Sequence, residues 1–521
     1  MTEVRASSSG HLGLFALKDF SLGDVVLEED AAVRLAPLND TYSKELLSEW
    51  MHGSSTQDIT KANKNTLWTS IKPPPSGLLP EYLHGTFKGM VQAGIIFIKK
   101  YQDNIEQTKL ESLLKLYYPT KGAASEAEKV IINVAEEAIL FLQQHVTTSK
   151  ATGKVFSGFK DWHQLQKLLL IWSCNSFEGG RIYLKISRVN HSCNPNSVIQ
   201  PSNDSQRCNR NNGNNDGQKL LAATRIEKGS EIFISYLGLL LYTDTDLRRK
   251  KLEQTKFFRC ACSRCIDTSS EFNGAAQIPC PISHPRDSQL MSLDEDSQYD
   301  DDQNVKYTVL PGPKSRIEWC KNYGMVENQK LFDVLQGVRT KMERFLDTYE
   351  QKSKNASSNI EQDEENEILE EHTSLASTMM GDKHWTSNLT LLFHLDRRLK
   401  AMSQHVVVTQ ELPELEDIAE AIDSLQRISR FVDSLKLDID PAHLLADVTI
   451  GTARMLISLG DEKSQKYGAE WLNKIEGYVN HFSNKGMQKV VSVLKVAWKK
   501  HGRSDNDEDD DFRKKKKKQK R

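Results

Sequence analysis

Long apolar runs are missing from this 521-residue chain. No stretch approaches the roughly 20 consecutive apolar residues that a bilayer-spanning helix needs, and no N-terminal signal peptide is recognisable. Both absences argue against a membrane protein and predict a soluble, intracellular one with no membrane partner. In that compartment the eight cysteines are expected to be thiols or metal ligands rather than disulfides.

A strong overall charge is also absent, because the formal net charge is only -2. The tail RKKKKKQKR (Arg513–Arg521) holds eight positive charges, so the rest of the chain carries about -10. This balance does not indicate a basic nucleic-acid-binding surface, and no direct sequence-specific binding to nucleic acid is expected. The tail is typical of a nuclear import signal, with a solvated, nonspecific anion-binding end as the alternative. We therefore expect the protein in the nucleus, the cytoplasm or both.

The length predicts two or three domains, the first of them β-rich. Short strands are predicted within residues 10–30 and again in RIYLKIS, NSVIQP, QKLLAATRI and GSEIFISYL, which lie between 181 and 237. Apolar residues three and four apart predict helices from about 40 to 170. We therefore place a helical insertion at about 31–164 inside a domain that spans 1–267.

Beyond residue 267 the chain is predicted to alternate between acidic linkers and helices. The segments are an acidic linker at 268–313, a helix at 314–350, a second acidic linker at 351–371, a helical C-terminal domain at 372–503 and a disordered charged tail at 504–521. Helical pairs with short turns indicate a stacked array. Tetratricopeptide-like stacking is one form of it, although no clean repeat of about 34 residues is visible. The expected fold class is α+β followed by an all-α domain.

The motif CACSRC places Cys260, Cys262 and Cys265 close together. Three thiolates at this spacing can bind one tetrahedral zinc ion, and a structural zinc site needs a fourth ligand. The other cysteines stand at positions 174, 193, 208, 280 and 320. We predict Cys193 as the fourth ligand, since it lies in the unusually polar segment RVNHSCNPNSV. Three unrelated thiols are the alternative.

Three motifs, taken in order, resemble the SET-domain lysine methyltransferases with a post-SET cysteine segment. They are NHSCNPN at 190–196, RIEKGSEIFISY at 225–236 and FFRCACSRC at 257–265. The resemblance implies a β-rich SET fold in which the first motif threads a loop near the second to form a pseudoknot. It also implies a post-SET zinc cluster at 258–267. The stretch CNSFEGGRIYLKISRVNHSCNPN is most similar to the SET and MYND group, but no cysteine precedes Cys174, so the MYND finger is absent.

The same resemblance implies S-adenosylmethionine as cofactor and assigns roles to residues. Tyr236 would be the catalytic-centre tyrosine that orients the methyl group and the amine, with an ordinary core tyrosine as the alternative. Phe177 would line the lysine channel. The expected cofactor contacts are Gly10, His11, Leu12, Gly13, Asn190, His191, Tyr236 and Phe258.

Two positions depart from the family pattern. His11 stands where the first glycine of a Gly-x-Gly is expected, unless Gly10 serves instead. Lys256 stands four residues before the first post-SET cysteine, where an aromatic residue is common, and Phe257 is its neighbour. The sequence thus predicts a protein-lysine N-methyltransferase acting on a histone or another protein. A catalytically weak or inactive SET-fold interaction scaffold is the alternative.

Overall fold

The computed structural model groups the chain into two compact units. The first comprises Met1–Tyr236 with Arg249–Cys260, and the second comprises Leu237–Arg248 with Ala261–Arg521. The structure describes residues 2–7, 11–35, 83–101, 105–122, 125–148, 159–177, 180–202, 217–266, 275–279, 307–309, 333–346, 360–483 and 485–501. Gly10 and the charged tail lie outside these ranges, so what the sequence predicts for them stays a prediction.

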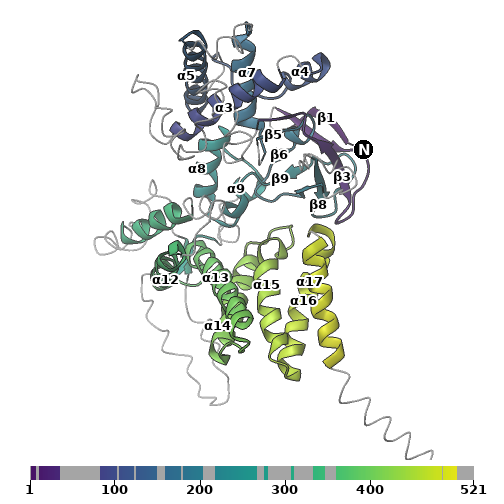
Figure 1. The fold of residues 1–521 in the computed structure, drawn as a ribbon, viewed down its shortest axis with the longest axis vertical. Helices are drawn as coiled ribbons and strands as arrows, with labels where there is room; N and C mark the ends of the chain where they lie inside the picture. Colours follow the sequence, from purple (N-terminus) through teal and green to yellow (C-terminus); the bar gives the residue numbers. More distant parts are fainter. Residues whose placement is uncertain are drawn as a thin grey trace, which may run out of the picture. The chain divides into compact units, whose positions relative to one another are not determined.

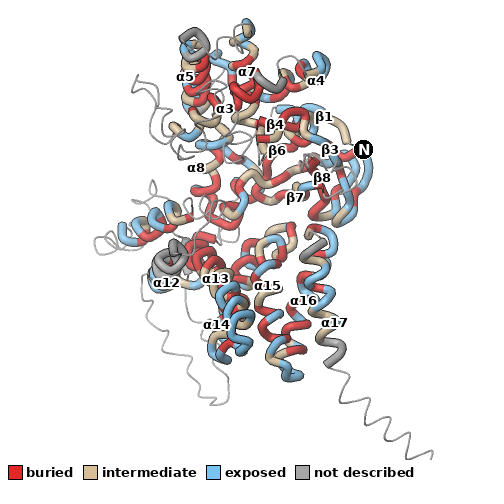
Figure 2. The backbone as a smooth tube through the Cα atoms, in the orientation of Figure 1, coloured by how far each residue is buried: buried red, intermediate tan, exposed pale blue. Residues whose placement is uncertain are grey.

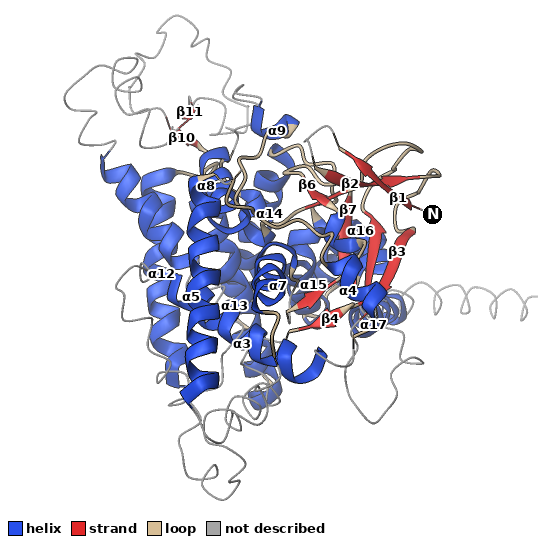
Figure 3. Ribbon diagram, turned by 90° about the horizontal axis from the view of Figure 1, so that it is seen from above, coloured by secondary structure: helices blue, strands red, loops and turns tan. Residues whose placement is uncertain are grey.

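Short strands build the core of the first unit (Figures 1 and 3). They are β1 (Thr2–Ala6), β2 (Leu12–Ala16), β3 (Val25–Asp30), β4 (Val33–Arg34), β5 (Arg181–Ile182), β6 (Asn190–His191), β7 (Ser197–Pro201), β8 (Gly217–Ala222) and β9 (Phe233–Ile234). The pairs β1–β2 and β4–β5 and the sheet β3–β8–β7 are antiparallel, whereas β6 and β9 are parallel. Leu14, Leu220 and Ile232 are fully buried between these strands.

The predicted strand RIYLKIS is wrong beyond its first two residues. β5 ends at Ile182, and a 3-10 helix, η2 (Ile186–Arg188), follows. The cause is Glu29, whose carboxylate accepts hydrogen bonds of 2.8 to 3.1 Å from the backbone N–H groups of residues 184–186. These successive donors are therefore taken from any strand ladder.

Helices between residues 84 and 175, the last of which extends past the predicted insertion at about 31–164, pack on one another within the first unit. They are α3 (His84–Tyr101), α4 (Gln107–Leu113), α5 (Glu126–Thr148) and α7 (Trp162–Asn175). Buried residues recur along these helices (Figure 2). They form one apolar cluster that includes Phe87, Leu142 and Leu169. Gly94 lets α3 approach α5 closely, because a Cβ there would lie 2.7 Å from Leu142 Cδ1. The helical period of the sequence thus reports a real apolar stripe.

The second unit is predominantly helical. Its C-terminal region consists of α12 (Ile360–Met380), α13 (Trp385–Thr409), α14 (Leu415–Ser434), α15 (Ala442–Ser458), α16 (Glu462–Phe482) and α17 (Lys485–His501). The all-α expectation for this region is confirmed. None of the helices in the described part of the chain is long and apolar enough to cross a membrane.

Two predicted linkers contain regular structure. α12 begins at Ile360, inside 351–371. β10 (Gln277–Pro279) and β11 (Tyr307–Val309) form an antiparallel pair inside 268–313. Within the predicted helix at 314–350, the structure describes residues 333–346, which are helical. Acidic composition alone therefore does not identify a linker in this chain.

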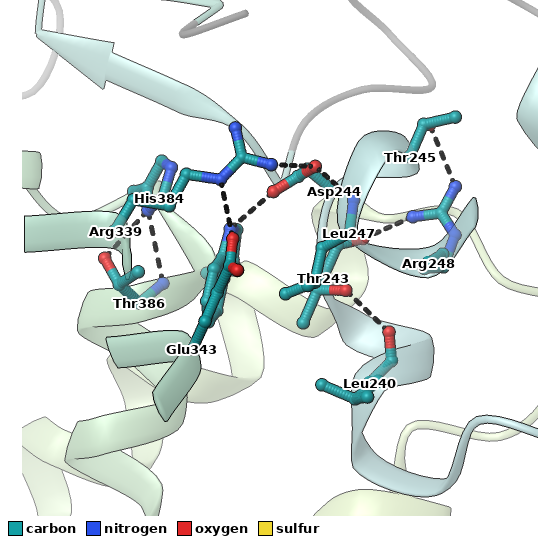
Figure 4. A network of polar contacts seen from close by, with 11 residues as sticks. Leu240, Thr243, Asp244, Thr245, Leu247, Arg248, Arg339, Glu343, His384 and Thr386 are labelled. Carbon is teal, nitrogen blue, oxygen red and sulfur yellow. Dashed lines mark hydrogen bonds and ion pairs between the residues drawn. The ribbon is translucent and has the colours of Figure 1, made fainter. Parts of the chain in front are cut away.

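A buried polar network in the second unit centres on Asp244, which precedes α8 (Thr245–Lys256) (Figure 4). Its carboxylate accepts hydrogen bonds of 2.8 Å from Arg339 Nη2, 2.8 Å from Trp385 Nε1 and 3.0 Å from the backbone N–H of Leu247. The Asp244 and Arg339 side chains are only 3% and 4% exposed. A charge pair this deeply buried stabilises a fold only while both partners stay ionised and hydrogen-bonded.

Acid is expected to destabilise the second unit through Asp244. Burial acts to raise the pKa of this carboxyl, but Arg339, the Leu247 N–H, His384 and Arg248 together hold the pKa below its usual range. A carboxyl with a depressed folded-state pKa contributes stability that is complete above the unfolded pKa of about 3.9 and is lost as the pH falls through the folded-state value. Thermal unfolding across the acid range should therefore show a weaker pH dependence for Asp244→Asn than for wild type. The exposed Asp246→Asn is the control and should keep the wild-type slope; an unchanged slope for Asp244→Asn would contradict the prediction.

Candidate active site and cysteine cluster

The segment 190–196 is joined to the strand that leads to Tyr236. β6 pairs in parallel with β9, and the Asn196 side chain completes the join. Its Nδ2 donates to the backbone oxygen of Glu231 (2.9 Å), and its Oδ1 accepts from the backbone N–H of Phe233 (2.8 Å). The amide-rich composition of this segment therefore satisfies buried backbone groups of a distant segment. Such a join is what the predicted pseudoknot requires.

Tyr236 lies just after β9 and is anchored at both ends. Its hydroxyl donates a hydrogen bond of 2.6 Å to the backbone oxygen of Val189, and its backbone N–H donates to His191 Nδ1 at 3.1 Å. Burial, with the charge of Glu231 acting in the same direction, raises the pKa of Tyr236 well above its usual range. The phenol is therefore neutral near physiological pH. With its proton donated to Val189, the phenol oxygen can still accept a hydrogen bond.

The His191 ring connects Tyr236 with the cysteine segment. Because Nδ1 accepts a hydrogen bond from Tyr236, a neutral ring carries its hydrogen on Nε2. Nε2 lies 3.3 Å from Cys193 Sγ, so this N–H points at the sulfur. Both ring nitrogens thus have partners within the protein. His191 would therefore contact the cofactor, as predicted, through its ring face or its backbone and not through a ring nitrogen.

Gly13, Asn190 and Glu231 form a close-packed group beside this join. Asn190 Nδ2 donates to Glu231 Oε1 (2.7 Å) and to the backbone oxygen of Leu12 (3.3 Å). A Cβ on Gly13 would lie 2.3 Å from Glu231 Oε1 and 3.0 Å from Asn190 Nδ2. The structure therefore brings three predicted cofactor residues together, Leu12, Gly13 and Asn190. An alanine at position 13 would require the Glu231 and Asn190 side chains to move.

Gly13→Ala is expected to weaken cofactor binding by displacing Glu231 and Asn190. Overpacking of this kind costs about 1–3 kcal/mol. If the displacement moves Asn190, the affinity for S-adenosylmethionine should drop about tenfold or more. Calorimetric titration with S-adenosylmethionine measures this affinity. The control is Gly85→Ala on α3, where an added Cβ meets nothing within 4 Å; equal affinities for the two variants would contradict the prediction.

The predicted aromatic residues occupy different surroundings. Phe258 lies 6.0 Å from the His191 ring and 6.4 Å from the Tyr236 ring, measured between centroids. Phe177 packs edge-on against Tyr183 at 5.5 Å and against the same apolar cluster as Tyr236. His11 lies apart from this group, because its exposed ring contacts Tyr117 of the helical insertion at 5.2 Å.

Sequence reasoning missed three polar residues near these positions. Glu231 accepts hydrogen bonds from Asn190 and, at 2.7 Å, from Ser7. It stands in the motif RIEKGSEIFISY, so the signal was present. The other two, Tyr117 and Glu128, are hydrogen-bonded to each other. They lie in the helical insertion, where no motif points to them.

The four predicted metal-ligating cysteines lie together. The Sγ atoms of Cys193, Cys260, Cys262 and Cys265 are all within 4.8 Å of one another, and Cys193 and Cys260 are 3.9 Å apart. Arg248 Nη2 donates to Cys265 Sγ at 3.7 Å. Cys174 lies elsewhere, with the pKa of its thiol raised by burial to about 11. Positions 208, 280 and 320 lie outside the described residues.

Comparisons with known proteins agree with these motifs. A family model described as the SET domain matches residues 11–237. The chain is 25% identical over 177 residues to the human N-lysine methyltransferase SMYD2, covering 32% of this chain and 36% of that protein. It is 36% identical over 102 residues to the human histone-lysine N-methyltransferase SMYD3, covering 18% and 20%. It is 29% identical over 112 residues to the histone-lysine N-methyltransferase SET5 of Saccharomyces cerevisiae, covering 22% and 19%.

The family match, the small sheets and the motif order define residues 11–237 as a SET domain. The predicted resemblance to SET-domain lysine methyltransferases, including the SET and MYND group, is confirmed for this part of the chain. The aligned regions span about a third of the first relative and about a fifth of the other two.

Proposed function

We propose that this chain is an S-adenosylmethionine-dependent protein-lysine N-methyltransferase. The observation that carries the proposal is the neutral Tyr236 hydroxyl, held beside the Asn190–His191 segment within a SET domain. The similar proteins are named as N-lysine and histone-lysine methyltransferases. The expected substrate is a lysine side chain of a histone or another protein.

The chemistry of the side chains around Tyr236 fits this cofactor. Bound S-adenosylmethionine would supply an electrophilic methyl group on a sulfonium. The Asn190 amide offers polar contacts, the Phe258 ring offers an aromatic face for adenine, and Gly13, which has no side chain, lies directly beneath Asn190. These three residues would hold the cofactor.

The residues of the chain would act on the acceptor amine. The Tyr236 oxygen would accept a hydrogen bond from the amine and so direct its lone pair. Phe177 and Phe258 would shield the amine from water, which favours its neutral form because burial lowers a lysine pKa. Holding both reactants in line supplies about 7–11 kcal/mol of the barrier in favourable systems.

The cysteine cluster would hold one zinc ion. Tetrahedral zinc with Zn–S bonds of about 2.3 Å places its sulfurs about 3.8 Å apart, close to the 3.9 Å between Cys193 and Cys260. Four thiolates around Zn²⁺ leave a net negative charge, which the buried Arg248 would offset through its bond to Cys265. The ion would fix Phe258, which stands two residues before Cys260.

One observation favours the alternative, an interaction scaffold with little or no activity. The Lys256 amine lies 5.5 Å from the centroid of the Tyr236 ring, in the place where substrate would be expected. Calorimetric titration with S-adenosylmethionine comes first, followed by transfer of radiolabelled methyl groups to cell lysate. Cofactor binding together with labelled lysate protein supports the proposed methyltransferase activity, and the absence of cofactor binding overturns it.

The basic tail supports nuclear import, which would place the activity in the nucleus as well as the cytoplasm.

A further inference from the structure

Lys256, the last residue of α8, places its amine against Tyr236. Its Nζ donates a hydrogen bond of 3.3 Å to the backbone oxygen of Cys174 and lies 5.5 Å from the centroid of the Tyr236 ring. Phe257 follows with φ of 62°, a left-handed conformation that non-glycine residues rarely adopt. This residue turns the chain sharply, so that Lys256 and Phe258 both reach Tyr236. The turn at Phe257 directs the Lys256 side chain, and the hydrogen bond to the Cys174 carbonyl holds its amine in place.

The surroundings of this amine favour its neutral form. Burial lowers the pKa of Lys256, and its neighbour Cys174 acts in the opposite direction. Since burial raises the pKa of the Cys174 thiol to about 11, that thiol is uncharged near neutral pH. The raised pKa of Tyr236 keeps the phenol uncharged as well. A neutral amine that donates one N–H to a carbonyl retains a lone pair for another reaction.

We infer that Lys256 is itself a methyl acceptor, modified in cis at the Tyr236 site of the same chain. The inference rests on the proposed function, because the methyl donor is the S-adenosylmethionine of that site. It deepens the proposed function by naming one acceptor. It also accounts for an amine in a place where the family resemblance implies an aromatic ring.

The reaction balances without a further reagent. The lone pair of Nζ forms a bond to the methyl carbon while the carbon–sulfur bond breaks. The sulfur keeps that electron pair and leaves as the neutral thioether S-adenosylhomocysteine. The methylated ammonium then loses one proton to water. A second methyl transfer would follow the same course.

The test uses the full chain, purified and incubated with S-adenosylmethionine that carries a deuterated methyl group. Peptide mass spectrometry is expected to find the heavy methyl on Lys256. The fraction modified per unit time should not change when the protein is diluted, because the reaction is intramolecular. Lys250→Arg, which alters an exposed lysine of the same helix, should keep the modification. A rate that rises with protein concentration would overturn the assignment in cis.

A second measurement does not depend on methyl transfer. Competitive labelling of the amines with acetic anhydride across a pH series, without cofactor, reports the titration of each lysine. Lys256 is expected to react as a free amine at lower pH than an ordinary lysine, whose pKa is about 10.4. A Lys256 that titrates at or above that value would mean a charged ammonium beside Tyr236 near neutral pH, and would overturn the inference.

The outcomes separate this inference from the proposed function. If the chain labels lysate protein and Lys256 stays unmodified, the inference is wrong and the proposed function stands. If Lys256→Met then labels lysate protein faster than wild type, Lys256 obstructs the site instead of accepting methyl. If neither lysate nor Lys256 is labelled, the proposed function fails and the inference falls with it. Heavy methyl on Lys256 that is lost in Tyr236→Phe supports both.

Discussion

Tyr236→Phe is expected to lose nearly all methyl transfer while it still folds and still binds cofactor within several-fold. The substitution keeps the ring against the apolar cluster and removes the hydroxyl that is bonded to Val189. A preorganised polar group at a reaction centre is commonly worth about 2.7–4 kcal/mol, or about a hundred- to a thousandfold in turnover. Transfer of radiolabelled methyl groups to an identified substrate measures the loss, and calorimetry measures cofactor affinity.

The chain offers a matched control in Tyr242→Phe. Tyr242 is buried and Tyr236 partly buried, and the Tyr242 hydroxyl lies 3.1 Å from His443 Nδ1. Each substitution removes one hydrogen-bonded hydroxyl, so each should lower the free energy of unfolding by about 0.5–1.5 kcal/mol. Only Tyr236→Phe should lose turnover. Wild-type turnover in Tyr236→Phe would show that Tyr236 is an ordinary core tyrosine.

Cys262→Ser is expected to release the metal and loosen the fold around it. We expect one zinc ion per wild-type chain, and the variant keeps only three of the four thiols. Structural zinc contributes about 10 kcal/mol or more to folding in small zinc-binding peptides, so the loss should be large. Metal analysis of purified protein measures the zinc content. Limited proteolysis measures local order as the rate of cleavage at sites that follow residue 256.

Cys174→Ser is the control for this change. Cys174 is not one of the clustered cysteines, so zinc content should stay at the wild-type value. The link from Cys193 through His191 to Tyr236 predicts that Cys262→Ser also weakens cofactor binding, although residue 262 itself would not touch the cofactor. Wild-type protein that binds cofactor but contains no zinc would contradict the metal assignment.

Local pattern was enough to predict much of the fold. Alternating or continuous apolar residues identified β2, β3, β7 and β8, and the helical period identified α5 and α7. The pattern failed in RIYLKIS, because Glu29 lies far away in the chain and captures the backbone donors of residues 184–186. It failed again at α12, where an acidic run that resembles a linker is the start of a helix.

The sequence by itself supplied the residues on which the proposed chemistry rests. The spacing of three cysteines, the polar segment around Cys193 and the position of Tyr236 follow from the order of residues alone. They support such a proposal because a tetrahedral metal and a reaction centre need particular atoms at short range.

Only the tertiary structure decided which side chains meet. Asn190 and Glu231 are hydrogen-bonded across 41 positions, and Arg339 and Asp244 across 95. The Lys256 amine reaches the Cys174 carbonyl across 82. Periodicity describes which face of an element is apolar, but it says nothing about which distant element covers that face. The close packing of Glu231 on Gly13 and the amine beside Tyr236 therefore become visible only once the chain is folded.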